Sequence, residues 1–133
     1  MLFGAEHVKR YRETGGEEGH DWQGTQTLIL TTTGRKSGDE RSTPLIYGRS
    51  GDDHLIVASK GGADDPPAWF LNLEANPEAE IQVKADRFKV HSRVAAPDEK
   101  PGMWSTMTGE WPAYDDYRKK TEREIPVVVL ERI

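Results

Sequence analysis

The sequence predicts an α+β protein built around a small mixed β-barrel of about six mostly antiparallel strands. The chain has 133 residues, and because one domain commonly takes roughly 100–200 residues, a single core is expected. Six short segments have the composition of strands, a helical segment separates the third from the fourth, and two more helical segments precede the last. The regular strand–helix alternation of a doubly wound parallel sheet is absent.

The first 24 residues are expected to form an N-terminal helix and a flexible connector ahead of a barrel domain at 25–133. Residues 5–13 fit a short amphipathic helix whose apolar members are Leu2, Phe3, Val8 and Tyr11. Such a helix usually packs on its own domain; it could also cap a site or meet a partner chain, and contact with a lipid surface is the less favoured alternative. Residues 14–24 contain four Gly and three acidic residues, which predicts a mobile connector.

The first half of the barrel is expected to contain three strands. Residues 25–33 (TQTLILTTT) are rich in β-branched and aliphatic side chains and end at a glycine, as expected for a buried strand before a turn. Further strands are predicted at 41–49 and 54–59, separated by the turn sequence at 50–53. Pro44 cannot donate to a sheet, so its strand is expected at an edge or to begin nearby.

The second half alternates helical and strand patterns. An opening proline and a closing Asn-Pro pair bound one helix, and apolar–polar alternation on either side of Ala85-Asp86 predicts a hairpin. The expected elements are a helix at 67–75, strands at 80–84 and 87–94, helices at 97–108 and 112–124, and a buried strand at 126–130.

Composition excludes several kinds of function. The net charge of −5 disfavours nucleic acid as a partner, because phosphate binding needs a concentrated basic surface. The chain has no cysteine, which excludes disulfides, thiolate metal sites, iron–sulfur clusters and a cysteine nucleophile. No apolar run approaches the roughly 20 residues of a membrane span, and no secretory apolar region is evident near the N-terminus. A cytoplasmic protein is therefore expected.

Motifs for several chemistries are missing as well. The histidines show no spacing that suits a metal site, and they are His7, His20, His54 and His91. We therefore expect no metal. The sequence contains neither a dinucleotide-binding G-x-G-x-x-G after a strand, nor a Walker loop, nor the G-x-S-x-G of an esterase.

A cationic turn stands out at 34–38 (GRKSG), followed by Arg41-Ser42-Thr43-Pro44. Two glycines allow backbone amides to approach an anion, three cations supply charge, and hydroxyls add donors. The alternative interpretation is a polar hairpin tip without a ligand, which composition alone favours slightly.

Two further segments are candidates for ligand binding. Residues 58–62 (ASKGG) end an apolar strand just before the helix that carries Trp69 and Asn72, an arrangement that suits close backbone contact with a planar ligand. An ordinary loop with Trp69 in the core is equally compatible. Trp111, Tyr114 and Tyr117 share a helical face; core packing is the more common explanation, but phenols near a redox-active ring can also donate a proton.

Three motifs occur in order along the chain: TTTGRKSGDERSTPLIY, VASKGGADDPPAWFLNLEANP and PAYDDYRKKTEREIPVVVLER. Together they resemble the deazaflavin-dependent nitroreductase family, from about Thr27 to Arg132. The resemblance implies a split β-barrel related to flavin-binding reductases, and coenzyme F420 as the cofactor. One departure is Trp111, where family members often have a tyrosine, and the N-terminal stretch does not align; both border the substrate pocket.

The resemblance also implies the roles of individual residues. The cofactor phosphate and its anionic tail would be held by Arg35, Lys36, Ser37, Arg41, Ser42 and Thr43. The deazaflavin would be lined by Val57, Ala58, Ser59, Lys60, Gly61, Ala68, Trp69 and Asn72. Tyr114 would reach the cofactor and, with Tyr117, the substrate pocket, and Tyr114, Tyr117 and Ser59 are the candidates for polarising the acceptor or protonating the product.

The implied function is hydride transfer from reduced deazaflavin to an electrophilic, conjugated small molecule such as a quinone, a nitroaromatic or an unsaturated lactone of the coumarin type. An FMN-dependent split-barrel reductase or oxidase and a non-catalytic F420 carrier are the alternatives. Nucleic-acid binding by a small barrel is disfavoured by the acidic balance. The chain is expected to act as a monomer or homodimer.

Overall fold

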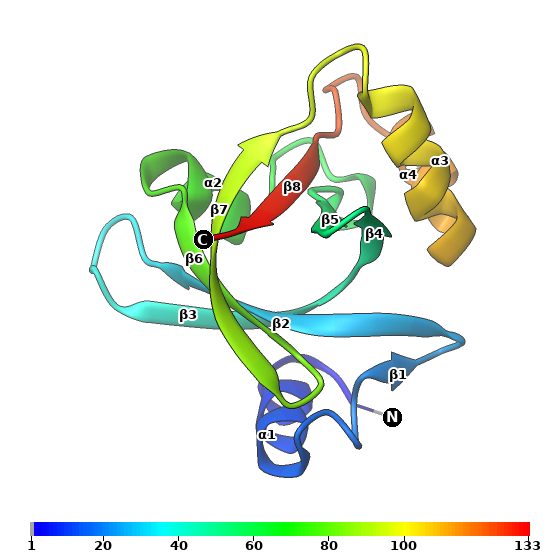
Figure 1. The fold of residues 1–133 in the computed structure, drawn as a ribbon. Helices are drawn as coiled ribbons and strands as arrows, with labels where there is room; N and C mark the ends of the chain where they lie inside the picture. Colours follow the sequence, from blue (N-terminus) through cyan, green and yellow to red (C-terminus); the bar gives the residue numbers. More distant parts are fainter. Residues whose placement is uncertain (1) are drawn as a thin grey trace.

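The computed structural model describes residues 2–133 and shows a curled antiparallel sheet with four helices around it (Figure 1). The helices are α1 (Gly4–Thr14), α2 (Ala68–Ala75), α3 (Lys100–Glu110) and α4 (Ala113–Lys119), with a short 3-10 helix η1 (Lys60–Gly62). The strands are β1 (Asp21–Trp22), β2 (Thr25–Thr33), β3 (Glu40–Ile46), β4 (Gly48–Ser50), β5 (Asp53–Val57), β6 (Glu78–Val83), β7 (Asp86–Val94) and β8 (Val127–Arg132). The expected α+β class is confirmed.

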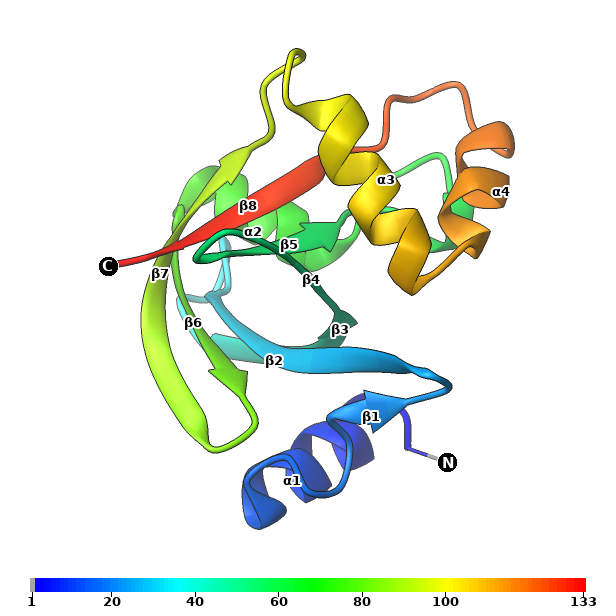
Figure 2. The same cartoon turned by 45° about the vertical axis from the view of Figure 1, so that its right-hand side comes forward.

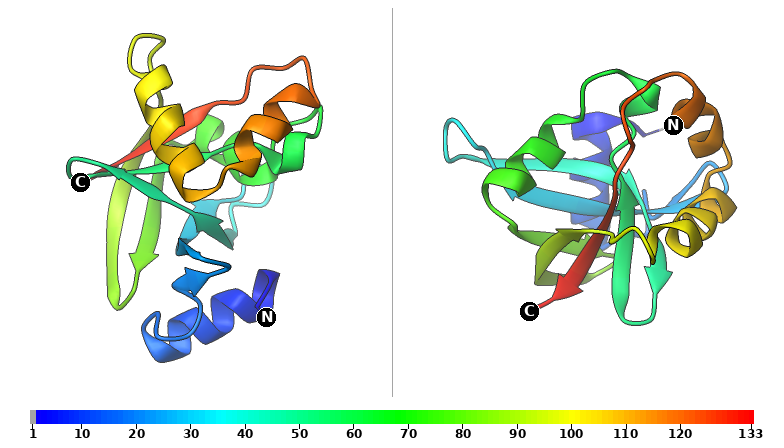
Figure 3. Two further views of the ribbon diagram at one scale, coloured as in Figure 1. Left: turned by 90° about the vertical axis from the view of Figure 1, so that its right-hand side faces the viewer. Right: turned by 90° about the horizontal axis from the view of Figure 1, so that it is seen from above.

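The sheet follows the order β1-β2-β6-β7-β8-β5-β4, with β3 paired to β2 off this path. Strand β2 covers the predicted range 25–33, and Pro44 of β3 lies opposite Ile29 of β2. Because β3 pairs with β2 alone, the expectation that Pro44 lies in an edge strand is confirmed. The α3–α4 pair and α1 lie on different sides of the curled sheet, as Figures 2 and 3 show.

Alternate residues of β5 and β8 face two separate hydrophobic cores. Ile56, Val128 and Leu130 pack inside the curled sheet, where α2 closes the core. Their neighbours Leu55 and Val129 pack under α3 and α4. Both strands are thus buried on both faces, which explains why their sequences read as continuous apolar runs.

Residues 14–24, expected to be a mobile connector, are folded against α1 and β2. His20 is buried, and this stretch contains β1. A Cβ atom on Gly19 would lie 2.9 Å from the His7 ring, at a φ of +107°. The glycine therefore permits close packing at this turn in a left-handed conformation.

Most other predicted elements are shifted at their ends by one to three residues, and two differ more. The predicted strand at 41–49 is divided between β3 and β4, and β1 is a further strand, so the sheet formed by residues 2–133 has eight strands rather than six. The last helix ends at Lys119, and the chain from there to β8 has no regular structure. No helix within residues 2–133 combines the length and the apolar composition that crossing a membrane requires.

Candidate functional site

The cationic turn and helix α2 enclose a cavity of about 360 Å³, termed the anion cavity. Its lining residues are Gly34, Arg35, Lys36, Ser37, Arg41, Ser42, Thr43, Ala68, Trp69 and Asn72. The turn connects β2 to β3, so the pairing of these two strands places Arg35 and Lys36 at one end of the cavity and Arg41 beside them. The structure thus brings together the whole predicted cationic motif.

Asn72 fixes the start of the turn. It is buried on α2, and its Oδ1 accepts hydrogen bonds from the Arg35 backbone N–H (3.2 Å) and from Arg35 Nη1 (2.9 Å). Its Nδ2 donates to the Thr32 hydroxyl at 3.1 Å. Each of these bonds joins two parts of the fold, so Asn72 orients a cation of the anion cavity in addition to lining it.

The cations of this cavity have no acidic partner. In the described part of the chain, the ion pairs with carboxylates involve none of Arg35, Lys36 and Arg41. All three residues lie at the surface around the turn, in a chain of net charge −5. Unpaired cations next to hydroxyl groups form a donor set that suits phosphate or carboxylate oxygens.

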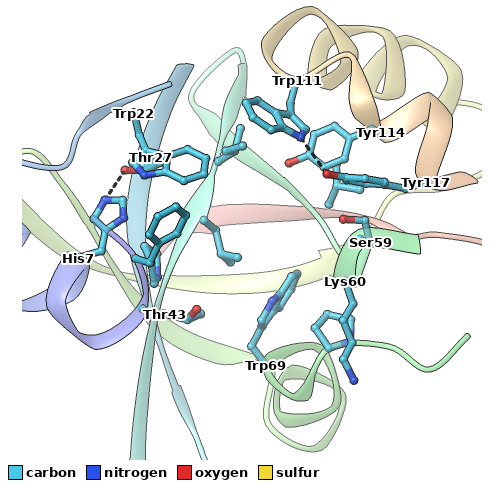
Figure 4. Close-up of a pocket in the computed structure, with 18 residues that line it drawn as sticks. His7, Trp22, Thr27, Thr43, Ser59, Lys60, Trp69, Trp111, Tyr114 and Tyr117 are labelled. Atoms are coloured by element: carbon cyan, nitrogen blue, oxygen red, sulfur yellow. Dashed lines mark hydrogen bonds between the residues drawn. The ribbon is translucent and has the colours of Figure 1, made fainter. Parts of the chain in front are cut away.

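A second cavity, of about 410 Å³, adjoins the first and is termed the aromatic cavity (Figure 4). It is lined by Phe3, Gly4, His7, Trp22, Thr27, Thr43, Pro44, Leu45, Ile46, Val57, Ser59, Lys60, Gly61, Pro67, Trp69, Trp111, Tyr114 and Tyr117. Thr43 and Trp69 line both cavities. One elongated ligand can therefore place a charged end among the cations and a planar end among the aromatic rings.

Aromatic rings from distant segments form one wall of this second cavity. Trp22 of β1 lies 5.9 Å from Trp111 and 5.7 Å from Phe3, measured between ring centroids. Its indole Nε1 donates to the Leu2 carbonyl at 2.8 Å, which ties the N-terminus to β1. Trp111 in turn lies next to Tyr114 and Tyr117 (Figure 4). Flat apolar walls of this kind suit a planar conjugated molecule.

All three residues predicted to act in catalysis line the aromatic cavity: Ser59, Tyr114 and Tyr117. The Tyr117 hydroxyl accepts a hydrogen bond from Trp111 Nε1 at 3.3 Å. Because an indole N–H can only donate, the proton of Tyr117 stays available for a ligand. Burial, and then the neighbouring Tyr117, raise the pKa of Tyr114 well above its usual value, so Tyr114 remains a protonated donor at neutral pH.

The residues expected around the deazaflavin do not all line the aromatic cavity, since Ala68 and Asn72 line the anion cavity alone. Ala58 lines neither cavity, because its side chain is fully buried in the core inside the sheet. Lys60 lines the aromatic cavity and not the anion cavity, and its Nζ pairs with Asp65 Oδ2 at 2.7 Å. The hydrogen bond from the Lys60 ammonium group lowers the pKa of Asp65. The cation of Lys60 is thus separated from the three cations of the turn.

The sequence did not single out several residues of the aromatic cavity. Phe3 and His7 come from the N-terminal helix region, for which capping a site was one alternative, and Trp22 lies in the supposed connector. A tryptophan within a polar, glycine-rich stretch was the available signal, since large aromatics in such a stretch usually have a packing partner. Among residues 2–133 no group of three or more histidine or acidic side chains is placed to hold a metal ion.

Comparisons with known proteins agree with this geometry. The model of the family described as F420H(2)-dependent quinone reductase matches residues 4–132. An F420H(2)-dependent quinone reductase of Mycobacterium tuberculosis strain H37Rv is 42% identical over 130 residues, which cover 95% of this chain and 87% of the relative.

Solved structures give the same result. One described as an F420-H2 dependent reductase (FDR-A) superposes with a TM-score of 0.73 at 34% identity, over 79% of this chain and 93% of that chain. Another, described as a domain-swapped dimer, gives a TM-score of 0.74 at 34% identity, over 79% of each chain. These similarities confirm the expected split-barrel fold.

Proposed function

This chain belongs to the F420H(2)-dependent quinone reductase family, which makes it an oxidoreductase that uses reduced coenzyme F420, and we propose that the anion cavity and the aromatic cavity together form its active site. The charged end of the cofactor would lie among Arg35, Lys36 and Arg41, and its ring would lie beside Trp69 and Val57 in the aromatic cavity. The quinone would occupy the remaining part of the aromatic cavity.

The observation that carries this proposal is the junction of the two cavities at Thr43 and Trp69. Three cations without acidic partners lie on one side of the junction, and aromatic rings with free hydroxyl groups lie on the other. A cofactor with a phosphate, an anionic tail and a planar ring requires both halves in one continuous site. The residues present therefore fit the group.

When bound, reduced F420 supplies a hydride to the acceptor. The chain's own residues would hold the acceptor and supply the one proton that the reduction requires besides the hydride. The hydroxyls of Ser59, Tyr114 and Tyr117 would donate hydrogen bonds to a quinone oxygen, and these bonds would stabilise the negative charge that develops on this oxygen during reduction. One hydride and one proton convert a quinone into a hydroquinone, and these hydroxyls, or water held by them, would deliver the proton.

The family assignment favours F420 over FMN as the cofactor, and turnover over a carrier role. Nitroaromatics and unsaturated lactones remain predictions as further substrates. We propose a homodimer as the assembly, because a related structure is described as a dimer, and a cytosolic location, which rests on the sequence alone.

The test is to mix the protein with reduced F420 and menadione and to follow the oxidation of the cofactor by absorbance. We expect menadione-dependent oxidation, and at least one of Ser59→Ala and Tyr114→Phe should lower turnover about 10- to 100-fold while the variant still binds the cofactor. Binding without oxidation by any acceptor would identify a carrier instead. Full turnover in both variants would remove the proposed roles of Ser59 and Tyr114.

A further inference from the structure

The loop between β5 and α2 forms one side of the aromatic cavity in a backbone conformation that needs support. Lys60, Gly61 and Gly62 all have left-handed φ angles, of +47°, +64° and +85°. This region is unfavourable for a residue with a Cβ atom such as Lys60. Ser59 and Lys60, which line the cavity, therefore depend on contacts elsewhere in the protein to keep their positions.

Arg123 provides such contacts from outside both cavities. Its Nε donates to the Ala63 carbonyl at 2.8 Å, Nη1 donates to the Ala58 carbonyl at 3.2 Å, and Nη2 donates to the Ser59 carbonyl at 2.9 Å. Each guanidinium nitrogen thus bonds a different carbonyl of the loop. Backbone carbonyls beyond the end of a strand lack the partners that a sheet provides, so these bonds satisfy them.

Two neighbouring contacts join the same loop to the segment around Arg123. The Thr121 hydroxyl donates to Asp64 Oδ1 at 2.9 Å. A Cβ atom on Gly62 would lie only 2.7 Å from the Tyr117 carbonyl oxygen, so the loop rests directly against the backbone of α4. The loop that carries Ser59 and the helix that carries Tyr117 are therefore held as one unit.

We propose that Arg123 is a positioning residue of the reductase, which fixes the loop at 58–63 so that Ser59 and Tyr117 form one preorganised side of the aromatic cavity. This inference rests on the proposed function for its consequence in catalysis, but its structural part concerns the chain alone. The early end of α4 makes the arrangement possible, because residues after Lys119 leave the helix and turn back along the loop.

Arginine is required at this position because of its geometry. A guanidinium group presents five N–H groups in a rigid plane and can reach three carbonyls at once. The ammonium group of a lysine is a single centre on a flexible stem, and it cannot occupy the positions of three guanidinium nitrogens. Arg123→Lys therefore keeps the positive charge and removes the planar group whose three nitrogens bond the three carbonyls.

The first test follows hydrogen exchange in the protein without cofactor. The amides of Gly62 and Ala63 donate to the carbonyls of Ser59 and Lys60, so they report whether the loop is closed. We expect exchange at these two amides to become about tenfold faster in Arg123→Lys, while the amides of β2 and β6 keep the rates of the wild type. Unchanged exchange at Gly62 and Ala63 would overturn the proposal.

The second test measures F420 binding and quinone turnover in Arg123→Ala, with and without added guanidinium at millimolar concentration. We expect roughly tenfold weaker F420 binding and a lower kcat, both partly restored by guanidinium and not by methylammonium. The matched control is Arg49→Ala, because Arg49 also donates to a backbone carbonyl, that of Gly51 at 3.2 Å, outside both cavities. The control variant should bind F420 and reduce the quinone as the wild type does, with or without added guanidinium.

The outcomes separate this inference from the proposed function. If the wild type fails to oxidise reduced F420, the proposed function is wrong, and the exchange measurement still decides whether Arg123 holds the loop. If the wild type is active and Arg123→Lys matches it in exchange, F420 affinity and kcat, only the positioning role is wrong. If Arg123→Ala fails to fold, Arg123→Lys supplies the comparison.

Discussion

The anion cavity and the aromatic cavity share Thr43 and Trp69 but are assembled in different ways. The anion cavity takes its charges from one hairpin connection, and a single helix, α2, closes it. The aromatic cavity takes its walls from α1, β1, β3, η1 and α4, which lie far apart in the sequence. The charge of the anion cavity is thus a local property of this chain, whereas the shape of the aromatic cavity is a property of the whole fold.

This difference predicts that the two cavities can be altered independently. A change in the hairpin should affect the affinity for the anionic cofactor and leave the aromatic walls intact. A change in the aromatic wall near β1 should affect the acceptor and leave the cofactor's charged end in place. Residues at the junction should affect both.

The largest effect is expected from removing the charges of the hairpin. The triple variant Arg35→Gln, Lys36→Gln and Arg41→Gln should bind F420 about 100-fold more weakly, because each exposed contact between charges contributes up to about 1 kcal/mol and three such contacts are lost. The binding of F420 can be followed by fluorescence titration. Its dependence on salt should also become weaker in the variant.

The matched control removes three cations outside both cavities, by Lys9→Gln, Lys89→Gln and Lys119→Gln. It changes the net charge by the same amount, so a long-range effect of charge would appear in both variants. Equal losses of affinity in the two triple variants would mean that the anion cavity has no special role.

A smaller effect is expected from the aromatic wall. Trp22→Leu should raise KM for menadione about tenfold, because an aromatic contact with the quinone contributes about 0.5–1.5 kcal/mol. The substitution also removes the ring that Phe3, His7 and Trp111 pack against in the wall. The dissociation constant of F420 should stay within about threefold of the wild type, since Trp22 lies outside the anion cavity.

Trp69→Leu is the corresponding variant at the junction of the two cavities. It should change both the KM for menadione and the dissociation constant of F420. If Trp22→Leu also weakened F420 binding as strongly as it raised KM, the two cavities would be one coupled site and could not be altered independently.

The smallest effect is expected from a change of pH on the turnover of menadione. Burial raises the pKa of Tyr114 above that of a free phenol, so the folded protein keeps this proton as pH rises through about 10, where an exposed tyrosine would lose it. In a Tyr117→Phe background, menadione turnover should therefore change less than about twofold between about pH 8 and pH 10. A decline with a midpoint near pH 10 would show that Tyr114 titrates as an exposed phenol.

The contrast between the locally built anion cavity and the aromatic cavity built from distant segments also explains what the sequence could predict. The cationic turn, the strand at 25–33 and the helix at 67–75 were predictable because their signals are local: charge next to glycine, β-branched runs, and a proline before an apolar helix. The burial of Ala58 follows from strand alternation, which places its side chain with Ile56 and Val128 in the inner core.

The features that the sequence did not predict depend on contacts between residues far apart in the chain. The contact between Trp22 and Trp111 joins residues 89 positions apart, and no local pattern indicates it. The glycines of residues 14–24 predict mobility by their composition. The sequence does not show whether another side chain packs against a glycine, as the ring of His7 does at Gly19. The role of Arg123 likewise emerges only once α4 is seen to end early.

The most direct test of the proposed active site compares F420 with the deazaflavin fragment that lacks the phosphate and the anionic tail. The wild type should bind F420 about 100-fold more tightly than the fragment, and the triple hairpin variant should bind both ligands with similar affinity, close to that of the wild type for the fragment. If the wild type shows no preference, or if the variant keeps it, the anion cavity does not hold the charged end of the cofactor, and the proposed active site is wrong.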